Sequence, residues 1–414
     1  MFNLRGNART SGEDRRKEAG NVFGEGTRTP VTISLMVKDP SHTGPCELYY
    51  HDIGDYLSRE EKLAIIENTG SIEGLEWHRI TPNEEGDWIN QRDPAFDRFI
   101  SLGDKSGDET NTIFSTYSQG LLTGRDSWAY NFSHERLSEN MSLMIDAYNE
   151  EVENFQRACE GLPKEKWPRV EDVISTDPKR ISWTHNLKQS LNRGKAIAFD
   201  ESKIVPSIYR PFSRAWLYFD RLLNERVYLM PKLFPTPEHE NVVISVLGKG
   251  ATKPFSVLAS NTLPDYEMIS KGQCFPMYWY ERMKGESGKP QGELGFGSQA
   301  QVDEHGYVRH EAITDWALEH FRKHYGDESI TKEDIFWYVY GVLHSPEYRS
   351  RFASNLKKQL ARIPLARDFW AFSKAGRKLG ELHLNYENVE PWPVKEETKL
   401  IMEDADWRVT KMRF

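Results

Sequence analysis

Apolar residues recur at helical spacing after Ser133, a residue type that caps helix N-termini well. Steps of mostly three and four residues place on one face Leu137, Met141, Met144, Ile145, Tyr148, Val152 and Phe155. We therefore predict one long helix beginning after Ser133, with this face in the core.

Further helical patterns follow Gly306. Separate faces are formed by Ile313, Trp316, Ala317 and Phe321, by Ile335, Phe336, Val339 and Leu343, by Tyr348, Phe352, Leu356 and Leu360, and by Phe369, Phe372, Leu379 and Leu382. Thr331 with Asp334, and Ser345 with Pro346, are the residue types of helix starts, and Pro364 is expected to end the third helix. These patterns predict a helical end to the chain.

Shorter β-branched and apolar runs predict strands at Val31–Lys38, Glu47–Tyr50, Phe212–Phe219, Val242–Leu247 and Phe275–Tyr280. A short helix is expected at Leu57–Asn68, where Ser58 and Glu61 have the spacing of a capping box. The apolar start, Met1–Gly6, and the strand at Val31–Lys38 cannot bury their own faces, and partner strands are not visible nearby. The polar, Gly-rich stretch Gly285–Gly306 is predicted to be a loop or linker. The fold class is predicted to be α+β.

Composition limits the class of protein. The chain has 414 residues, 38% hydrophobic and 12% aromatic, which suits two or three packed domains. It carries no apolar run of about 18 residues and no signal-peptide core. Cys46, Cys159 and Cys274 are too far apart for a zinc motif. We expect a cytoplasmic protein that does not span a membrane and binds no metal.

Charge is unevenly distributed along this acidic chain, whose net charge is −9. Residues 175–260 carry 13 Lys and Arg against 7 Asp and Glu, and residues 349–378 carry 9 against one. Two basic stretches in an acidic chain fit a localised surface for a polyanion, although basic outer helix faces would give the same counts.

Motifs for catalysis are missing from the sequence. It contains no GxxxxGK[ST], HExxH, paired CxxC or GxSxG, and Gly24 with Gly26 lacks the third glycine of a dinucleotide loop. Asp265 and Glu267 lack the Glu-x-Lys of a common nuclease site, so we interpret them as solvated acids. His51, His310 and His344 have no matched nucleophile. No catalytic residue is predicted.

Arg, Gln and aromatic residues interleaved with small polar ones remain as candidates for DNA contact. Arg reads guanine and Gln reads adenine bidentately, while Ser, Thr and Lys position phosphates. The predicted DNA-binding residues are Tyr117, Ser118, Gln119, Thr123, Arg125, Asp126, Arg210 and Arg214, with Arg349, Lys357 and Lys358 as phosphate contacts. Many proteins contain such mixtures, so chemistry alone leaves other functions open.

Long segments of the chain resemble the type ISP restriction–modification enzymes. The resemblance rests on FNLRGNARTSGEDRRKEAGNVFGEGTRTPVTISLMVK, LYYHDIGDYLSREEKL, IFSTYSQGLLTGRDSWAYNFS, IVPSIYRPFSRAWLYFDR, GQCFPMYWYE, YVYGVLHSPEYRSRFASNLKKQLARIP and FWAFSKAGRKLGELHLNYE. Members of that family join a nuclease, a helicase motor, an adenine-N6 methyltransferase and a C-terminal target-recognition domain in one polypeptide. The motifs of the first three, including the S-adenosylmethionine loop, have no counterpart here.

The resemblance implies a division of the chain into three parts. Residues 1–75 would be the last strands of a methyltransferase α/β sheet, residues 76–300 a mixed α/β target-recognition domain, and residues 301–414 its helical subdomain. The expected function is sequence-specific recognition of double-stranded DNA, without activity of the chain alone. S-adenosylmethionine is expected only in the complete enzyme, whose methyltransferase, helicase and nuclease portion would be the protein partner.

Two alternatives stay open at this point. The chain could complete a split adenine-N6 methyltransferase in trans with an upstream chain, or it could be an inactive remnant that folds poorly.

Overall fold

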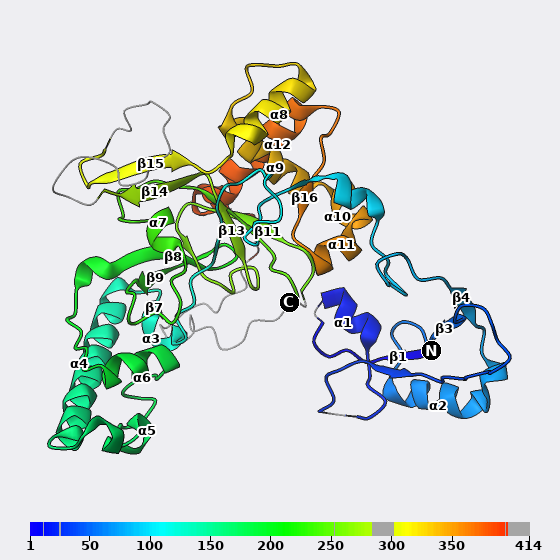
Figure 1. Ribbon diagram of the computed structural model, residues 1–414, viewed down its shortest axis with the longest axis horizontal. Helices are drawn as coiled ribbons and strands as arrows, with labels where there is room; N and C mark the ends of the chain where they lie inside the picture. Colours follow the sequence, from blue (N-terminus) through cyan, green and yellow to red (C-terminus); the bar gives the residue numbers. More distant parts are fainter. Residues whose placement is uncertain (11, 25, 252, 284–301, 394, 396–414) are drawn as a thin grey trace.

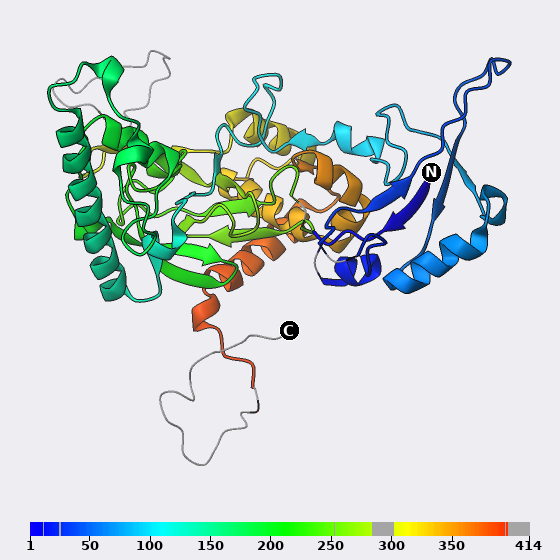
Figure 2. The same ribbon diagram turned by 90° about the horizontal axis from the view of Figure 1, so that it is seen from below.

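The computed structural model describes residues 1–10, 12–24, 26–251, 253–283, 302–393 and 395. A small N-terminal unit stands to one side of a larger body that the rest of the chain forms, in both Figure 1 and Figure 2. Across the described residues the structure has twelve α-helices and several small sheets, which confirms the predicted α+β class.

The N-terminal unit is a four-stranded sheet in the order β2-β1-β3-β4, flanked by helices. Its elements are β1 (Phe2–Arg5), α1 (Gly12–Glu18), β2 (Val31–Ile33), β3 (Leu48–Asp52), α2 (Arg59–Thr69), η1 (Ile72–Gly74) and β4 (His78–Ile80). Ser58 and Glu61 form the predicted capping box at the start of α2.

The expectation that the first strands lack partners nearby is wrong. β1 pairs antiparallel with β2 and parallel with β3, and β3 pairs with β4. Because a parallel pair needs a long connection, the local pattern gives no sign of it. The unit buries a small core of its own, formed by Phe2, Leu4, Val22 and Ile53.

The strand predicted at Val31–Lys38 ends early, at Ile33. Leu35, Met36 and Val37 are 65%, 91% and 83% exposed, so the apolar run leaves the sheet instead of packing on it.

Two more four-stranded sheets form the middle of the chain, in the orders β11-β10-β13-β6 and β12-β8-β9-β7. The elements of this region are η2 (Pro94–Arg98), β5 (Ile100–Ser101), β6 (Ser118–Gln119), α3 (Asp126–Ala129), β7 (Tyr130–Asn131), α4 (His134–Cys159), η3 (Lys164–Lys166), α5 (Val170–Val173), α6 (His185–Asn192), η4 (Glu201–Lys203), β8 (Ile204–Arg210), β9 (Ser213–Tyr218), α7 (Met230–Leu233), β10 (Val243–Val246), β11 (Val257–Ser260), β12 (Leu263–Pro264), β13 (Gln273–Pro276), β14 (Tyr278–Arg282) and β15 (Tyr307–Glu311). The predicted strands at Phe212–Phe219 and Val242–Leu247 are β9 and β10. The strand predicted at Phe275–Tyr280 is divided between β13 and β14, with Met277 between them.

Helix α4 confirms the clearest pattern of the sequence. The Ser133 side chain accepts a hydrogen bond from the backbone N–H of Arg136, and all seven residues of the predicted face are buried. They form a second core with the sheet that contains β8 and β9, together with residues such as Leu217, Tyr218 and Leu187.

The C-terminal part is helical, as predicted. It consists of α8 (Asp315–Tyr325), α9 (Lys332–His344), α10 (Pro346–Arg351), α11 (Ala353–Lys358), β16 (Arg362–Ile363), α12 (Phe369–Leu384) and η5 (Tyr386–Asn388). Thr331 and Asp334 form a capping box on α9, and Ser345 caps α10.

The single helix predicted from Pro346 to Pro364 is wrong. It breaks at Phe352 and ends at Lys358, after which β16 pairs antiparallel with β5. The Tyr348 hydroxyl also donates a 2.7 Å hydrogen bond to the Arg362 carbonyl. These contacts with distant residues override the helical spacing.

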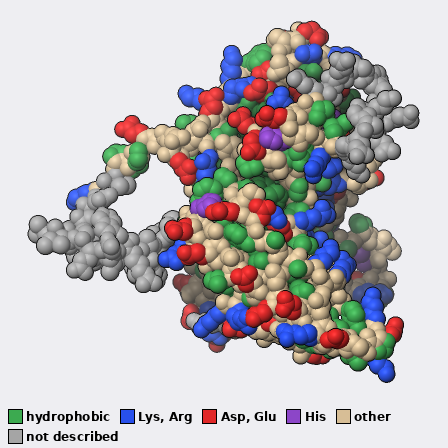
Figure 3. All heavy atoms as spheres, turned by 90° about the vertical axis from the view of Figure 1, so that its left-hand side faces the viewer, with side chains coloured by type: hydrophobic (Ala, Val, Ile, Leu, Met, Phe, Trp, Pro, Cys, Tyr) green, Lys and Arg blue, Asp and Glu red, His purple; other side chains and the backbone are tan. Residues whose placement is uncertain are grey.

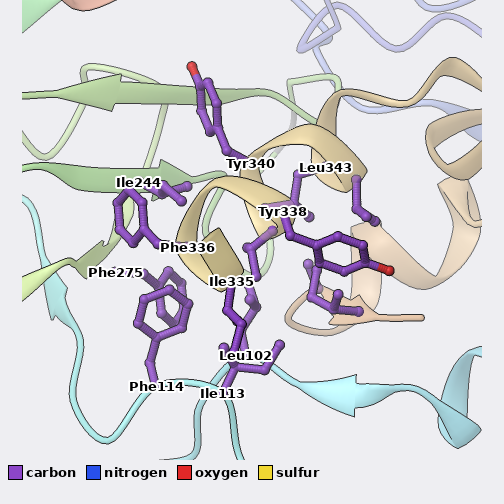
Figure 4. Packing of buried hydrophobic residues seen from close by; sticks show 14 of the residues in the cluster. Leu102, Ile113, Phe114, Ile244, Phe275, Ile335, Phe336, Tyr338, Tyr340 and Leu343 are labelled. Carbon is purple, nitrogen blue, oxygen red and sulfur yellow. The ribbon is translucent and has the colours of Figure 1, made fainter. Parts of the chain in front are cut away.

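Helix α9 lies inside the largest core, which explains why it is apolar on nearly all sides. Figure 4 shows Phe336 beside Ile244 of β10 and Phe114 beside Phe275 of β13, while Tyr338 points away from them. Strands before residue 300 and helices after it therefore share one core. The predicted domain boundaries at 75/76 and 300/301 stay predictions, and most of the predicted linker at 285–306 lies outside the described residues.

Candidate nucleic-acid interface

The polar stretch 117–126 runs along the edges of both central sheets. It begins in β6, which pairs with β13, and reaches α3 through a loop fixed by backbone hydrogen bonds. Leu121 N–H donates to the Pro264 carbonyl at 2.8 Å, and Leu122 and Arg226 exchange bonds at 3.0 and 2.9 Å. The sequence-predicted residues of this stretch are thus held on a rigid frame.

Exposure and contacts differ among the side chains of Tyr117, Ser118 and Gln119. The Tyr117 ring stacks on Phe275 at 4.7 Å, and the Lys105 ammonium lies 4.1 Å from its centre. Ser118 is fully buried, and its hydroxyl accepts a bond from Leu229 N–H. Gln119 is half-buried and lies opposite Gln273. Tyr117 and Gln119 therefore keep part of their side chains exposed, whereas Ser118 is enclosed in the frame, and the contact of all three with DNA stays a prediction.

Thr123 and Arg125 are buried. Thr123 bonds to Asp126 through its hydroxyl, and Arg125 is only 3% exposed. Arg125 Nη2 donates to Thr184 Oγ1 at 2.7 Å, while Nε and Nη1 have no hydrogen-bond partner. Burial lowers the pKa of Arg125 to about 10, so it remains charged at neutral pH. In this conformation Arg125 joins the loop to α6, and contact with a base would require it to move.

Arg210 stands at the centre of a charged cluster. Its Nη1 donates to Asp265 Oδ1 at 2.8 Å, its Nη2 lies 3.7 Å from Asp126 Oδ2, and its guanidinium lies 3.8 Å from the centre of the Tyr209 ring. The Tyr209 hydroxyl also donates to Asp126 at 3.1 Å. The Arg210 side chain stays 38% exposed, so its position is fixed while part of it faces solvent.

The interpretation of Asp265 as a solvated acid is wrong, because the residue is only 4% exposed. It follows β12 in a turn where its carboxylate accepts the Glu267 N–H at 2.9 Å. Desolvation raises the pKa of Asp265 to about 6, and the charge of Asp126 adds to the shift, while Arg210 opposes it. Glu267, the second acid of that turn, is half-buried.

Replacing Asp265 by Asn is expected to remove a pH dependence of stability. A carboxyl group with a higher pKa in the folded than in the unfolded chain stabilises the fold when protonated, and this contribution is lost as pH rises through about 4 to 6. The wild type should therefore lose about 1 kcal/mol relative to Asp265→Asn between pH 5 and pH 7. Urea unfolding at both pH values measures this, and a constant difference would contradict it.

Arg214 connects the β8–β9 hairpin to the end of the helical part. Its guanidinium contacts Glu387 at 3.1 Å and Asn261 at 3.2 Å, and its N–H donates to the Tyr386 hydroxyl. The Arg214 side chain is 35% exposed and paired with Glu387, and its contact with DNA stays a prediction.

Three of the nine basic residues of the second stretch are paired with acids from residues 87–109. Lys358 pairs with Asp87, Arg351 with Asp93 at 2.7 Å, and Arg362 with Glu109. Hydrogen bonds from Arg92 and from Lys358 hold the pKa of Asp87 well below its usual range.

The three predicted phosphate contacts of this stretch differ in their surroundings. Arg349 is half-buried and donates to the Leu343 carbonyl at 2.8 Å, and Lys358 is the partner of Asp87. Lys357 is exposed, and no acid in the described part of the chain lies within ion-pair distance of it. A phosphate role therefore fits Lys357 better than Arg349 or Lys358.

Some residues of this interface were not among the predicted ones. Gln273 lies beside Gln119, and Lys271, Lys249 and Lys105 are exposed near the same edge. The lysines carry no ion pair among the described residues. The register of β6 against β13 brings the two glutamines together, while the Lys271–Gly250 hydrogen bond and the Lys105–Tyr117 contact bring the lysines to the same edge.

Charge is separated on the surface as well as along the sequence. Figure 3 shows Lys and Arg side chains gathered at mid-height in the right-hand half of that face, with more acidic side chains toward the left. Such separation lets an acidic protein present a locally positive surface.

In parallel α/β sheets, ligands bind beyond the carboxyl ends of the strands. At that end of β1 and β3, Arg5 donates to Asp52 at 2.6 Å and also pairs with Asp55. Binding of S-adenosylmethionine by the complete enzyme stays a prediction.

The described part of the chain holds no group of three or more His, Cys, Asp or Glu placed to bind a metal ion. Among its helices, none has the length and apolar character to cross a bilayer.

Several solved structures resemble this chain, and three of them are DNA complexes. A nuclease-deletion mutant of the Type ISP restriction-modification enzyme LlaGI, in complex with a DNA substrate mimic, is 38% identical with a TM-score of 0.75, over 95% of this chain and 33% of that one. A DrdV–DNA complex is 33% identical with a TM-score of 0.77, over 98% and 37%. The ATP-dependent Type ISP restriction-modification enzyme LlaBIII bound to DNA is 32% identical with a TM-score of 0.73, over 95% and 23%.

The chain thus spans between 23% and 37% of the length of these solved proteins. A search of curated proteins finds no match. The model of the Type ISP C-terminal specificity domain matches residues 112–414, which include both central sheets and the helical part. The chain therefore belongs to the Type ISP C-terminal specificity domain family.

Proposed function

We propose that this chain recognises a specific sequence in double-stranded DNA, as the C-terminal part of a type ISP restriction–modification enzyme. The observation that carries the proposal is the edge of the two central sheets. There Tyr117, Gln119 and Arg210 remain accessible on a rigid frame, with unpaired lysines around them. Amide and guanidinium groups read base edges, and lysines position phosphates. The solved relatives in complex with DNA support the same function.

A selection from a random duplex library tests this function. The full chain is expected to enrich one sequence family at moderate salt, because base contacts discriminate while phosphate contacts do not. Affinity for all duplexes should fall as salt rises. Equal recovery of all sequences would contradict the proposal.

The proposed protein partner is the upstream methyltransferase, helicase and nuclease portion, in the cytoplasm, where S-adenosylmethionine would bind to that portion. The N-terminal unit supports this interaction. A shallow hollow there is lined by apolar residues including Phe2, Ile33, Leu35, Ile66 and Trp77, and the adjacent Met36 is 91% exposed. Exposed apolar surface of this kind commonly marks a protein interface.

The same hollow favours a second candidate function, completion of a split adenine-N6 methyltransferase in trans. Mixing the chain with the product of an upstream reading frame, S-adenosylmethionine and DNA should then give methyl transfer that neither half gives alone. Absence of that gain would remove this candidate and leave DNA recognition untouched.

A further inference from the structure

The strand pair β6–β13 places two glutamines side by side at a sheet edge. Gln119 is directly opposite Gln273, and Ser118 is opposite Cys274. Ser118 and Cys274 are fully buried, so the two glutamines, which alternate with them, occupy the other face and are half-buried. Directly opposed residues of an antiparallel pair have Cβ atoms about 4.5–5.5 Å apart, so the two glutamine side chains start from neighbouring positions on one face.

One of the carboxamides is already oriented. Gln273 Nε2 donates to the Lys271 carbonyl at 3.1 Å, which leaves its oxygen and one N–H available. Gln273 lies in β13, and the turn before this strand, at Ser270 and Lys271, packs closely against the turn at Gly248. The Gly248 N–H donates to the Ser270 carbonyl, and a Cβ at Gly248 would lie 2.1 Å from the Lys271 carbonyl oxygen.

The turn beside Gln273 is held in an uncommon conformation. Ser270 and Lys271 both have positive φ, 68° and 52°, in the left-handed region that favours glycine. Strained backbone of this kind often belongs to ligand-contacting segments. Here it projects Lys271 next to Lys249, whose neighbour Gly250 accepts a 3.1 Å bond from the Lys271 ammonium.

Positive charge without acid partners surrounds the glutamine pair. Lys249 and Lys271 are exposed, and Lys105 lies over Tyr117, two residues before Gln119. In the described part of the chain no carboxylate lies within 4.0 Å of these three ammonium groups. They contrast with Lys358 and Arg351, which are paired with Asp87 and Asp93.

We propose that Gln119 and Gln273 form the adenine-reading element of this chain, and that Lys249 and Lys271 hold the adjacent phosphates. A carboxamide meets adenine bidentately, donating to N7 and accepting from the N6 amino group in the major groove. Two glutamines whose Cβ atoms are about 5 Å apart suit bases on neighbouring pairs, which are stacked about 3.4 Å apart. This inference rests on the proposed function and specifies which bases it reads.

Library selection with the full chain tests the assignment. Gln119→Ala and Gln273→Ala should each lower the preference for adenine at one position about 10- to 100-fold, with other positions unchanged. Gln359→Ala, at the end of α11, is the matched control and should leave the enriched sequence as it is. Lys271→Ala should weaken binding to all duplexes alike and reduce the salt slope by about 1.

Gln273→Glu tests the assignment through a changed base preference, whereas the alanine variants test it through a weakened one. A carboxylate accepts from cytosine N4 and cannot donate to N7, so the preference at that position should shift from adenine toward cytosine. Thermal melts of all variants establish that they are folded.

The outcomes separate this assignment from the proposed function. If Gln119→Ala, Gln273→Ala and Gln273→Glu enrich the same sequence as the wild type, the two glutamines do not read bases, and the proposed function stands. If the wild type enriches no sequence, the proposed function fails and this assignment fails with it.

Discussion

Replacing Gly376 by alanine is expected to destabilise the fold by about 3 kcal/mol or more, although alanine is the better helix former. Helix α12 crosses α9 at this point, and a Cβ at Gly376 would lie 1.9 Å from the Trp337 carbonyl oxygen and 2.7 Å from the Gly341 backbone nitrogen. Both are backbone atoms, so the helices must separate to admit a methyl group. That separation would open the largest core, to which α9 contributes Phe336 and Tyr338.

The direction of the change in folding free energy distinguishes helix propensity from helix packing. Helix propensity alone predicts that Gly376→Ala stabilises by about 1 kcal/mol, while the helix crossing predicts the opposite. Ala375, the exposed neighbour, provides the control, since Ala375→Gly should cost only about 1 kcal/mol of propensity. Chemical denaturation of both variants measures the difference, and a stabilised Gly376→Ala would show that the two helices do not pack this closely.

Elements with a complete local signal could be predicted from the sequence. Ser133 and the apolar face behind it predict α4, and the capping boxes at Ser58 and Thr331 predict α2 and α9. In each case the cap, the spacing and the burial are set within one segment, so tertiary contacts had nothing to override.

Features that depend on distant pairing could not be predicted. β1 pairs with β3 as well as with β2, and β16 replaces the end of a predicted helix because residues 100–101 pair with it. The basic stretch after Arg349 looked like a phosphate surface. Three of its nine cations instead meet Asp87, Asp93 and Glu109, more than 200 residues away in the chain.

In the candidate site, the sequence predicts the types of residue, whereas the fold decides how exposed each of them is. Arg125 and Arg210 were predicted on equal chemical grounds, but the fold buries Arg125 against Thr184 and leaves Arg210 partly exposed. Sequence identifies residues that can read a base, whereas burial and partners decide which of them reach the surface. Arg210 is therefore the arginine of the predicted set on which we base the strongest functional test.

Replacing Arg210 by alanine is expected to weaken binding of the preferred duplex about 10- to 100-fold and to relax the preference for guanine at one position. The guanidinium is held by Asp265 and stacked on Tyr209, so little conformational entropy is lost when it docks on a base. Lysine keeps the charge but lacks the planar fork of donors, so Arg210→Lys should restore general affinity without the guanine preference.

Competition between the preferred duplex and a scrambled one measures both effects in wild type, Arg210→Ala and Arg210→Lys. A uniform loss with both duplexes, restored by lysine, would make Arg210 a phosphate contact, and unchanged binding would exclude it from the interface. Thermal melts are required because Asp265 loses its cation in Arg210→Ala. Its pKa, already about 6, should then rise further, so the carboxyl group can become protonated instead of remaining buried as an unpaired charge. The variant is therefore expected to stay folded, and its loss of guanine preference would reflect the missing contact with the base.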